Sequence, residues 1–165
     1  MASCGACLNA LMFMLLLSFA CVAHSDRGNC VYSIYVKTVD ETSAGTDAKV
    51  NLKLYDNQGN MVEIADLELF GLMPKGHNYF EPNNLDAFAI RTKCLANLIC
   101  KIELSHDNTG DNPAWKVDYV DVTTAVPQIY CTTKDFDIDD IISPIVVRDT
   151  CGGVKESVLK MLDLA

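Results

Sequence analysis

The chain has 165 residues, of which 22 are Asp or Glu and 13 are Lys or Arg, so its net charge is -9 at pH 7. This charge disfavours nucleic acid as a partner, because binding to a phosphate backbone needs clusters of Lys and Arg. It also disfavours unaided binding to an anionic lipid surface, for which acidic loops would need a bridging cation.

The N-terminal segment, residues 1–25, carries no charged side chain and contains a long apolar run that starts at Leu8. The run ends in Cys21-Val22-Ala23, a small-x-small pattern that is typical of a secretory signal peptide. A retained membrane anchor is the alternative, but the run is shorter than the roughly 20 residues that span a bilayer. We therefore expect cleavage near Ala23 or Ser25 and entry into the secretory pathway.

Strand patterns follow the signal segment. Apolar and polar residues alternate with a period of two in Tyr32–Lys37 and again in Lys49–Tyr55, as in half-buried strands. Turn residues at 56–60 and a second apolar stretch at Met61–Leu69 predict a hairpin. Further strands are predicted at Leu85–Thr92, Ile99–Ser105 and Ala114–Thr123. This spacing predicts an all-β protein, an antiparallel β-sandwich of about eight strands.

The pattern weakens after Cys131, so we place one domain at residues 26–131 and a C-terminal extension at 132–165. Within the extension, acidic and apolar residues alternate over Lys134–Asp140, which is typical of a solvated strand edge. An EF-hand is rejected here, because Asp140 and Val146 stand where that loop needs Gly and Glu. Further on, Val154, Val158 and Leu162 have helical spacing and predict a short C-terminal helix.

Cysteine usage points to an oxidising compartment. Five cysteines remain after the signal segment, and they allow two disulfides with one free thiol. One arrangement joins Cys94 to Cys100 and Cys131 to Cys151, leaving Cys30 free; a Cys30–Cys131 pair is the competing arrangement. Metal ligation by these thiols is not expected, because the sequence contains no C-x-x-C motif.

Catalytic motifs are missing from the sequence. It has no G-x-S-x-G, H-E-x-x-H, G-x-G-x-x-G or P-loop pattern, and His77 and His106 are isolated. A nucleophilic cysteine paired with a histidine has no support from the spacing. We therefore expect a protein that is not an enzyme and that has no cofactor, calcium excepted.

Three motifs occur in a fixed order along the chain. Gly45-Thr46-Asp47 comes first, the pattern N-x-F-E-x-x-x-x-D follows from Asn78 to Asp86, and W-x-V-x-Y-V-x-V spans Trp115 to Val122. This order resembles the PLAT/LH2 domain found at the N-terminus of lipoxygenases. It is most similar to the secreted plant proteins in which one such domain follows a signal peptide, and the resemblance covers about residues 30–131.

The resemblance implies a β-sandwich that docks on membrane lipid or on a protein partner and does no chemistry itself. It also suggests an apoplastic or ER-luminal protein with a role in plant stress responses. A protein–protein adaptor that ignores both lipid and calcium is the alternative. A monomer is expected.

The resemblance further implies a calcium site on loops at one end of the sandwich. The residues that it carries over are Gly45, Thr46, Asp47, Asn78 and Glu81, with Asp111 or Asp107 placed to complete the site. Ca²⁺ prefers oxygen ligands of this kind. Tyr79 stands where calcium-binding members of the family often have a second acid, which should weaken the site. The alternative is that these residues cap turns and hydrogen-bond to the loop backbone.

Apolar residues for docking are expected at Phe70, Leu72 and Met73, in a segment just before the acidic loop. The alternative is that this segment packs inside the protein. The family usually has Trp where Phe70 stands. Trp115 lies in a strand pattern, so we expect it in the core.

Overall fold

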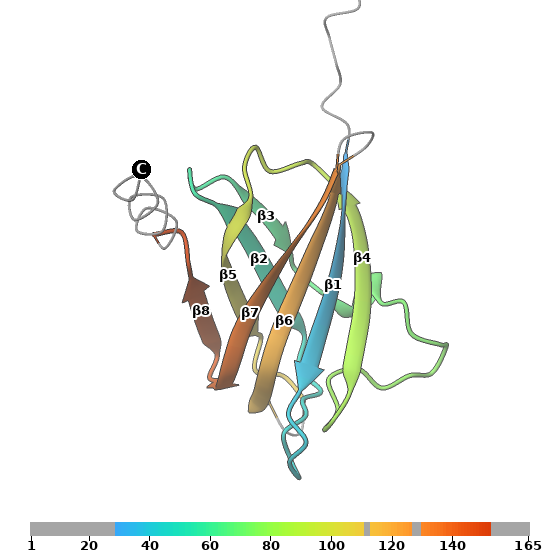
Figure 1. The fold of residues 1–165 in the computed structure, drawn as a ribbon. Helices are drawn as coiled ribbons and strands as arrows, with labels where there is room; N and C mark the ends of the chain where they lie inside the picture. The colour runs from blue at the N-terminus through green and yellow to red at the C-terminus, as the bar shows by residue number, and fades with distance from the viewer. Residues whose placement is uncertain (1–28, 111–112, 127–129, 153–165) are drawn as a thin grey trace, which may run out of the picture.

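The computed structural model describes residues 29–110, 113–126 and 130–152, and these residues form an all-β sandwich (Figure 1). The predicted antiparallel sandwich of about eight strands is confirmed. Its strands are β1 (Cys30–Thr38), β2 (Val50–Asp56), β3 (Met61–Ile64), β4 (Leu85–Thr92), β5 (Ile99–His106), β6 (Trp115–Val126), β7 (Tyr130–Ile142) and β8 (Ile145–Asp149), with one 3-10 turn, η1 (Glu68–Phe70).

Each layer of the sandwich is a four-stranded sheet. The first sheet has the order β4-β1-β6-β7 and the second has the order β3-β2-β5-β8, and every pairing is antiparallel. The strands alternate between burial and exposure, because one face of each sheet packs on the other sheet. In β1, for example, Tyr32, Ile34 and Val36 are fully buried.

The core lies between the two sheets, and Trp115 is its largest fully buried side chain, as predicted. The indole Nε1–H donates a hydrogen bond to Oγ1 of Thr38 at 3.0 Å, so the one polar atom of the ring is satisfied inside the core. The ring of Phe80 meets that of Trp115 edge-on, with 5.0 Å between their centroids. This contact brings the loop before β4 into the core.

The structure differs from the sequence prediction in two strands. β3 ends at Ile64 instead of continuing to Leu69, because Leu67 is fully buried and its N–H donates to the carbonyl of Val50 at 2.8 Å. This contact turns the chain into η1. Later in the chain, the expected domain boundary at residue 131 falls inside β7. β7 belongs to the first sheet and β8 to the second.

β7 carries an acidic outer face, and for this reason the sequence indicated only a solvated strand edge here. Phe136 and Ile138 are buried, whereas Asp135, Asp137 and Asp139 between and beside them are exposed. The expected C-terminal helix and the signal peptide lie outside the described residues. Within the described ranges, no helix is long and apolar enough to cross a membrane.

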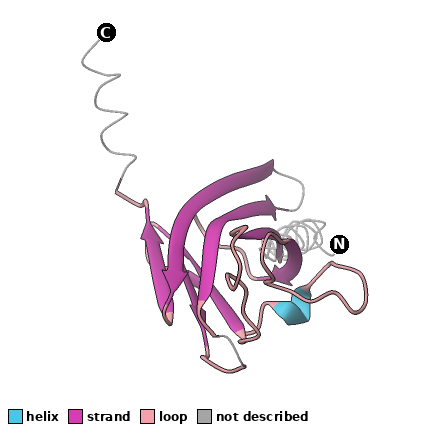
Figure 2. Ribbon diagram, turned by 90° about the horizontal axis from the view of Figure 1, so that it is seen from below, coloured by secondary structure: helices cyan, strands magenta, loops and turns pink. Residues whose placement is uncertain are grey.

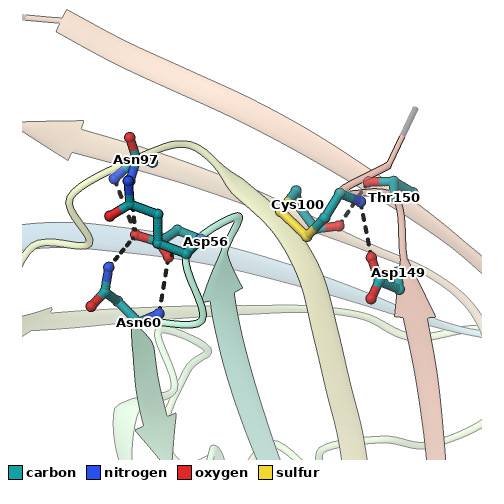
Figure 3. The surroundings of a disulfide bond; sticks show 8 residues. Asp56, Asn60, Asn97, Cys100, Asp149 and Thr150 are labelled. Carbon is teal, nitrogen blue, oxygen red and sulfur yellow. Dashed lines mark hydrogen bonds between the residues drawn. A yellow bond between two sulfur atoms is a disulfide. The ribbon is translucent and has the colours of Figure 1, made fainter. Parts of the chain in front are cut away.

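Two disulfides join neighbouring strands, and neither is one of the pairs considered from the sequence. Cys30 bonds to Cys94, because β1 pairs with β4 so that Cys30 lies opposite Thr92. Cys100 bonds to Cys151, because β5 and β8 pair Lys101 with Asp149 next to it (Figure 3). Cys131 is exposed and free in the part of the chain that the structure describes. The two disulfides are compatible with an extracellular or secretory-pathway protein.

Candidate functional site

The three sequence motifs meet at one end of the sandwich, the lower end in Figure 1. Thr46 holds them together and is itself buried. Its N–H donates to the carbonyl of Phe80 at 3.1 Å, and its Oγ1–H donates to the carbonyl of Pro113 at 3.2 Å. The loop after β1 is thus bonded both to the loop before β4 and to the loop before β6.

Two glycines allow the loops to approach closely. A Cβ atom on Gly45 would lie 2.8 Å from Cδ of Pro82 and 2.9 Å from the carbonyl oxygen of Phe80. Gly110 has a φ of +81°, and a Cβ atom there would lie 2.7 Å from Cβ of Asp47. Gly45 therefore has a steric role in the GTD motif, which places Asp47 where the loops meet.

The motif around Phe80 is held by a buried carboxylate. Phe80 is buried with a φ of 59°, and its N–H donates to Oδ2 of Asp86 at 2.7 Å. Oδ1 of Asp86 lies 2.6 Å from Nε2 of His77, so both oxygens fix the same loop. Asp86 and His77 were not candidates from the sequence; the signal for Asp86 was its position as an acid on a core-facing strand register.

Asp47 and Glu81 line one cavity of about 170 Å³ at this end of the molecule. Ser43, Gly45, Thr46 and Pro82 complete its lining. Asp47 is exposed and Glu81 is half-buried, so solvent reaches both carboxylates. The family resemblance implied that these two acids lie on loops at the same end of the sandwich. In the structure, both line one cavity.

The side-chain amide of Asn78 is bonded to Glu81. Its side-chain Nδ2–H donates to Oε1 of Glu81, and its backbone carbonyl accepts a hydrogen bond from Nδ2 of Asn84 at 3.0 Å. The amide therefore acts on the orientation of one carboxylate. This is the role in loop bonding that the sequence left open for these residues.

Asp107 is bonded to its own loop. Its Oδ1 accepts hydrogen bonds from Oγ1 of Thr109 at 2.6 Å, from the N–H of Thr109 and from the N–H of Lys49. The hydrogen bonds from Thr109 are the main cause of a lowered pKa of Asp107, and Lys49 contributes less; partial desolvation acts in the opposite direction. Asp111, the other acid considered, lies outside the described residues. In the described ranges, no group of three or more His, Cys, Asp or Glu side chains is arranged so that it could hold a metal ion.

The apolar segment Phe70–Met73, which lies along β4, is partly exposed. Leu72 is 62% exposed, whereas Phe70 and Met73 are half-buried and Phe70 packs against the core. Leu69 is 77% exposed and was not a candidate from the sequence. It lies in η1, the short helix drawn in cyan in Figure 2. Leu69 and Leu72 are therefore the most exposed of the apolar side chains here.

Tyr79 connects this segment to the acidic loop. Its hydroxyl accepts a hydrogen bond from the N–H of Met73 at 3.1 Å, and its ring packs on Phe88 with centroids 5.3 Å apart. The N–H of Leu72 donates to the carbonyl of Ala87 at 2.8 Å, so the segment lies along the edge of β4. The residue that replaces an expected acid thus has a packing role.

Comparison with known proteins gives a consistent assignment. A family model described as PLAT/LH2 domain matches residues 32–144. PLAT domain-containing protein 1 of Arabidopsis thaliana is 35% identical over 170 residues, which cover 92% of this chain and 94% of that protein. PLAT domain-containing protein 2 of the same plant is 32% identical over 174 residues, which cover 93% and 95%.

The fold also matches solved structures. A calcium-dependent 11R-lipoxygenase superposes with a TM-score of 0.55 at 20% sequence identity, covering 79% of this chain and 20% of that one. At this identity the likeness concerns the fold alone.

Proposed function

Because this chain belongs to the PLAT/LH2 domain family, we propose that it is a non-catalytic binding module that docks on lipid surfaces with the help of calcium. The observation that carries the proposal is the shared cavity of Asp47 and Glu81. A location in the secretory pathway belongs to the same proposal, since millimolar calcium is found outside the cytosol.

The donors at the cavity are oxygen atoms, the kind that calcium prefers, although fewer than three acids of the described residues gather there. Ca²⁺ takes six to eight oxygen ligands in a flexible geometry, from carboxylates, carbonyls and water. Asp47 and Glu81 supply two carboxylates, and an opening to solvent leaves room for water ligands. The described residues place two acids at the cavity, so we expect a weak site, with a Kd on the order of 10⁻⁴–10⁻³ M as in extracellular modules.

Calcium would change the charge of this end of the molecule. Two carboxylates repel an anionic bilayer, and a bound divalent cation cancels that charge. Leu69 and Leu72 lie on the neighbouring segment and are exposed, so they can enter the interfacial region once repulsion is removed. Tyr79 joins the segment to the acidic loop through its hydrogen bond with Met73.

Co-sedimentation with anionic phosphatidylserine vesicles tests the proposal. The natural chain should bind in millimolar calcium and stay in solution in excess chelator. Replacing both acids, Asp47→Asn with Glu81→Gln, should abolish the calcium-dependent binding. The matched control, Asp135→Asn with Asp137→Asn, neutralises two exposed acids on β7 and should bind like the natural chain.

The alternative is an adaptor that binds protein and needs neither lipid nor calcium. Equal vesicle binding in calcium and in chelator, or no binding in either, would favour the adaptor. A folded D47N/E81Q variant that still binds in a calcium-dependent way would move the calcium site elsewhere.

A further inference from the structure

A second cavity, of about 300 Å³, opens between the two sheets at the end opposite to the loop site. β6 starts at the loop site with Trp115 and carries Val122 and Thr124 to the far end, where they pair with Lys134 and Thr132 of β7. Leu98 and Ile99, at the start of β5, form the other wall. The far cleft, as we call it, is lined by Leu98, Ile99, Val122, Thr124, Thr132, Thr133 and Lys134.

The far cleft leaves apolar surface in water. Leu98 is 61% exposed, although it stands next to Ile99, which belongs to the core. A volume of about 300 Å³ is at the lower limit of ligand sites, which hold roughly 300–1,000 Å³. It therefore suits a few inserted aliphatic side chains better than a large ligand.

The Cys100–Cys151 disulfide joins a later part of the chain to β5, the strand that begins at this cleft. Cys100 follows Leu98 and Ile99 directly, and its carbonyl accepts hydrogen bonds from both the N–H and the Oγ1–H of Thr150 at 2.8 Å. Gly152, one residue after the disulfide, is the last described residue, and residues 153–165 continue from there. Thr150 and Cys151, which precede that segment, are thus held next to the start of β5 by a covalent bond and two hydrogen bonds.

The sequence of that segment has an apolar stripe. Val154, Val158, Met161 and Leu162 follow the i, i+4, i+7, i+8 spacing of one helical face. Charged residues occupy other positions, among them Glu156, Lys160 and Asp163. Gly152 and Gly153 precede the stripe, and glycine sets few steric limits on the direction that a chain takes.

We propose that residues 154–162 dock on the far cleft and insert apolar side chains between Leu98 and Thr132. The tether favours this occupant over a free ligand or a second copy, because a short linker gives an effective concentration in the millimolar range. Docking would also remove Leu98 from water. The proposal is independent of calcium and of the loop site.

Methyl NMR on the full chain tests it. Nuclear Overhauser contacts are expected between the methyl groups of Leu98 or Ile99 and those of Val158 or Leu162. Val158→Asp should abolish these contacts and shift the Leu98 methyl resonances. Lys160→Gln is the matched control, because it changes the net charge by the same single unit on another face and should keep them.

Three results would overturn the proposal. The first is the absence of such contacts in the natural chain. The second is a Leu98 resonance that does not respond to Val158→Asp. The third is a set of contacts that arise only between differently labelled copies in a mixed sample, which would assign the cleft to a dimer interface.

Discussion

The carboxylate of Asp86 accepts a hydrogen bond from the backbone N–H of Phe80 at 2.7 Å, and Asp86 is completely buried. This one bond fixes a residue with positive φ at the point where the acidic loop enters the core. The carbonyl of the same Phe80 accepts a hydrogen bond from the N–H of Thr46. The positions of Asp47 and Glu81 therefore depend on a buried acid that is not itself at the cavity.

Asp86→Ala should destabilise the fold and misplace the acidic loop. The substitution leaves the N–H of Phe80 without its partner, and His77 loses its contact as well. We expect the free energy of unfolding to fall by about 2–4 kcal/mol, since bonds to charged groups are worth more than neutral ones. Urea unfolding measures this. Asp40→Ala, at an exposed acid of the same end, is the control and should change stability by less than about 0.5 kcal/mol.

Thr38→Val should also be costly, although it keeps the side-chain shape. It leaves the indole N–H of Trp115 without an acceptor in the core, which costs about 1–3 kcal/mol. A double-mutant cycle with Trp115→Phe checks the reason. Thr38→Val should cost clearly less in the Trp115→Phe background, and equal costs in both backgrounds would rule out this hydrogen bond as the cause.

Much of the fold could be predicted from the sequence, because half-buried strands leave a period-two pattern. β4 has the predicted bounds, Leu85–Thr92, and Trp115 is in the core as expected. The alternation over Lys134–Asp140 indicated a solvated strand edge, but neither the full length of β7 nor β8 was predicted, because exposed acids separate the buried residues of β7. In β8, Ile145 and Val147 are apolar but exposed, so apolar and polar residues do not alternate there as they do in a half-buried strand.

The disulfide arrangement can be checked by peptide mapping under non-reducing conditions. We expect peptides that link Cys30 to Cys94 and Cys100 to Cys151. Alkylation without reductant should label Cys131, which is exposed. A Cys94–Cys100 or Cys131–Cys151 peptide would contradict the strand register. Sequence spacing failed here because pairing depends on which strands become neighbours, which is set by the sandwich topology.

Asp56 should make stability sensitive to acid. It is the buried last residue of β2, and burial raises its pKa. Hydrogen bonds from Asn60, Gln58 and Asn97 outweigh burial and lower the pKa below the ordinary 3.8; Figure 3 shows Asn60 and Asn97 beside the carboxylate. A depressed pKa means that the ionised form stabilises the fold. This contribution is complete above the ordinary pKa and is lost as pH falls through the folded-state value.

Asp56→Asn removes that titration. Its free energy of unfolding should therefore fall less steeply than that of the natural chain between about pH 5 and pH 2. Thermal or urea unfolding across this range provides the comparison. Parallel pH profiles for the two proteins would show that Asp56 is not responsible.

The candidate site was predictable in composition but not in organisation. The GTD and N-x-F-E motifs indicated Asp47 and Glu81, and the structure puts both at one cavity. Asn78 and Asp107 were expected as calcium ligands, and their hydrogen bonds to Glu81 and Thr109 could not be predicted, because these bonds depend on the local loop conformation. Leu69 was not a candidate, because the sequence placed it in a strand that continues β3, whereas the structure places it in η1.

Calorimetric titration of calcium into the natural chain and into the Asp47→Asn, Glu81→Gln variant tests the proposed calcium site most directly. We predict one weak site in the natural chain, with a Kd on the order of 10⁻⁴–10⁻³ M, and no heat of binding in the variant, with the fold of both confirmed by circular dichroism. No calcium binding by the natural chain at several millimolar, or equal binding by the two proteins, would contradict calcium-assisted docking at this cavity.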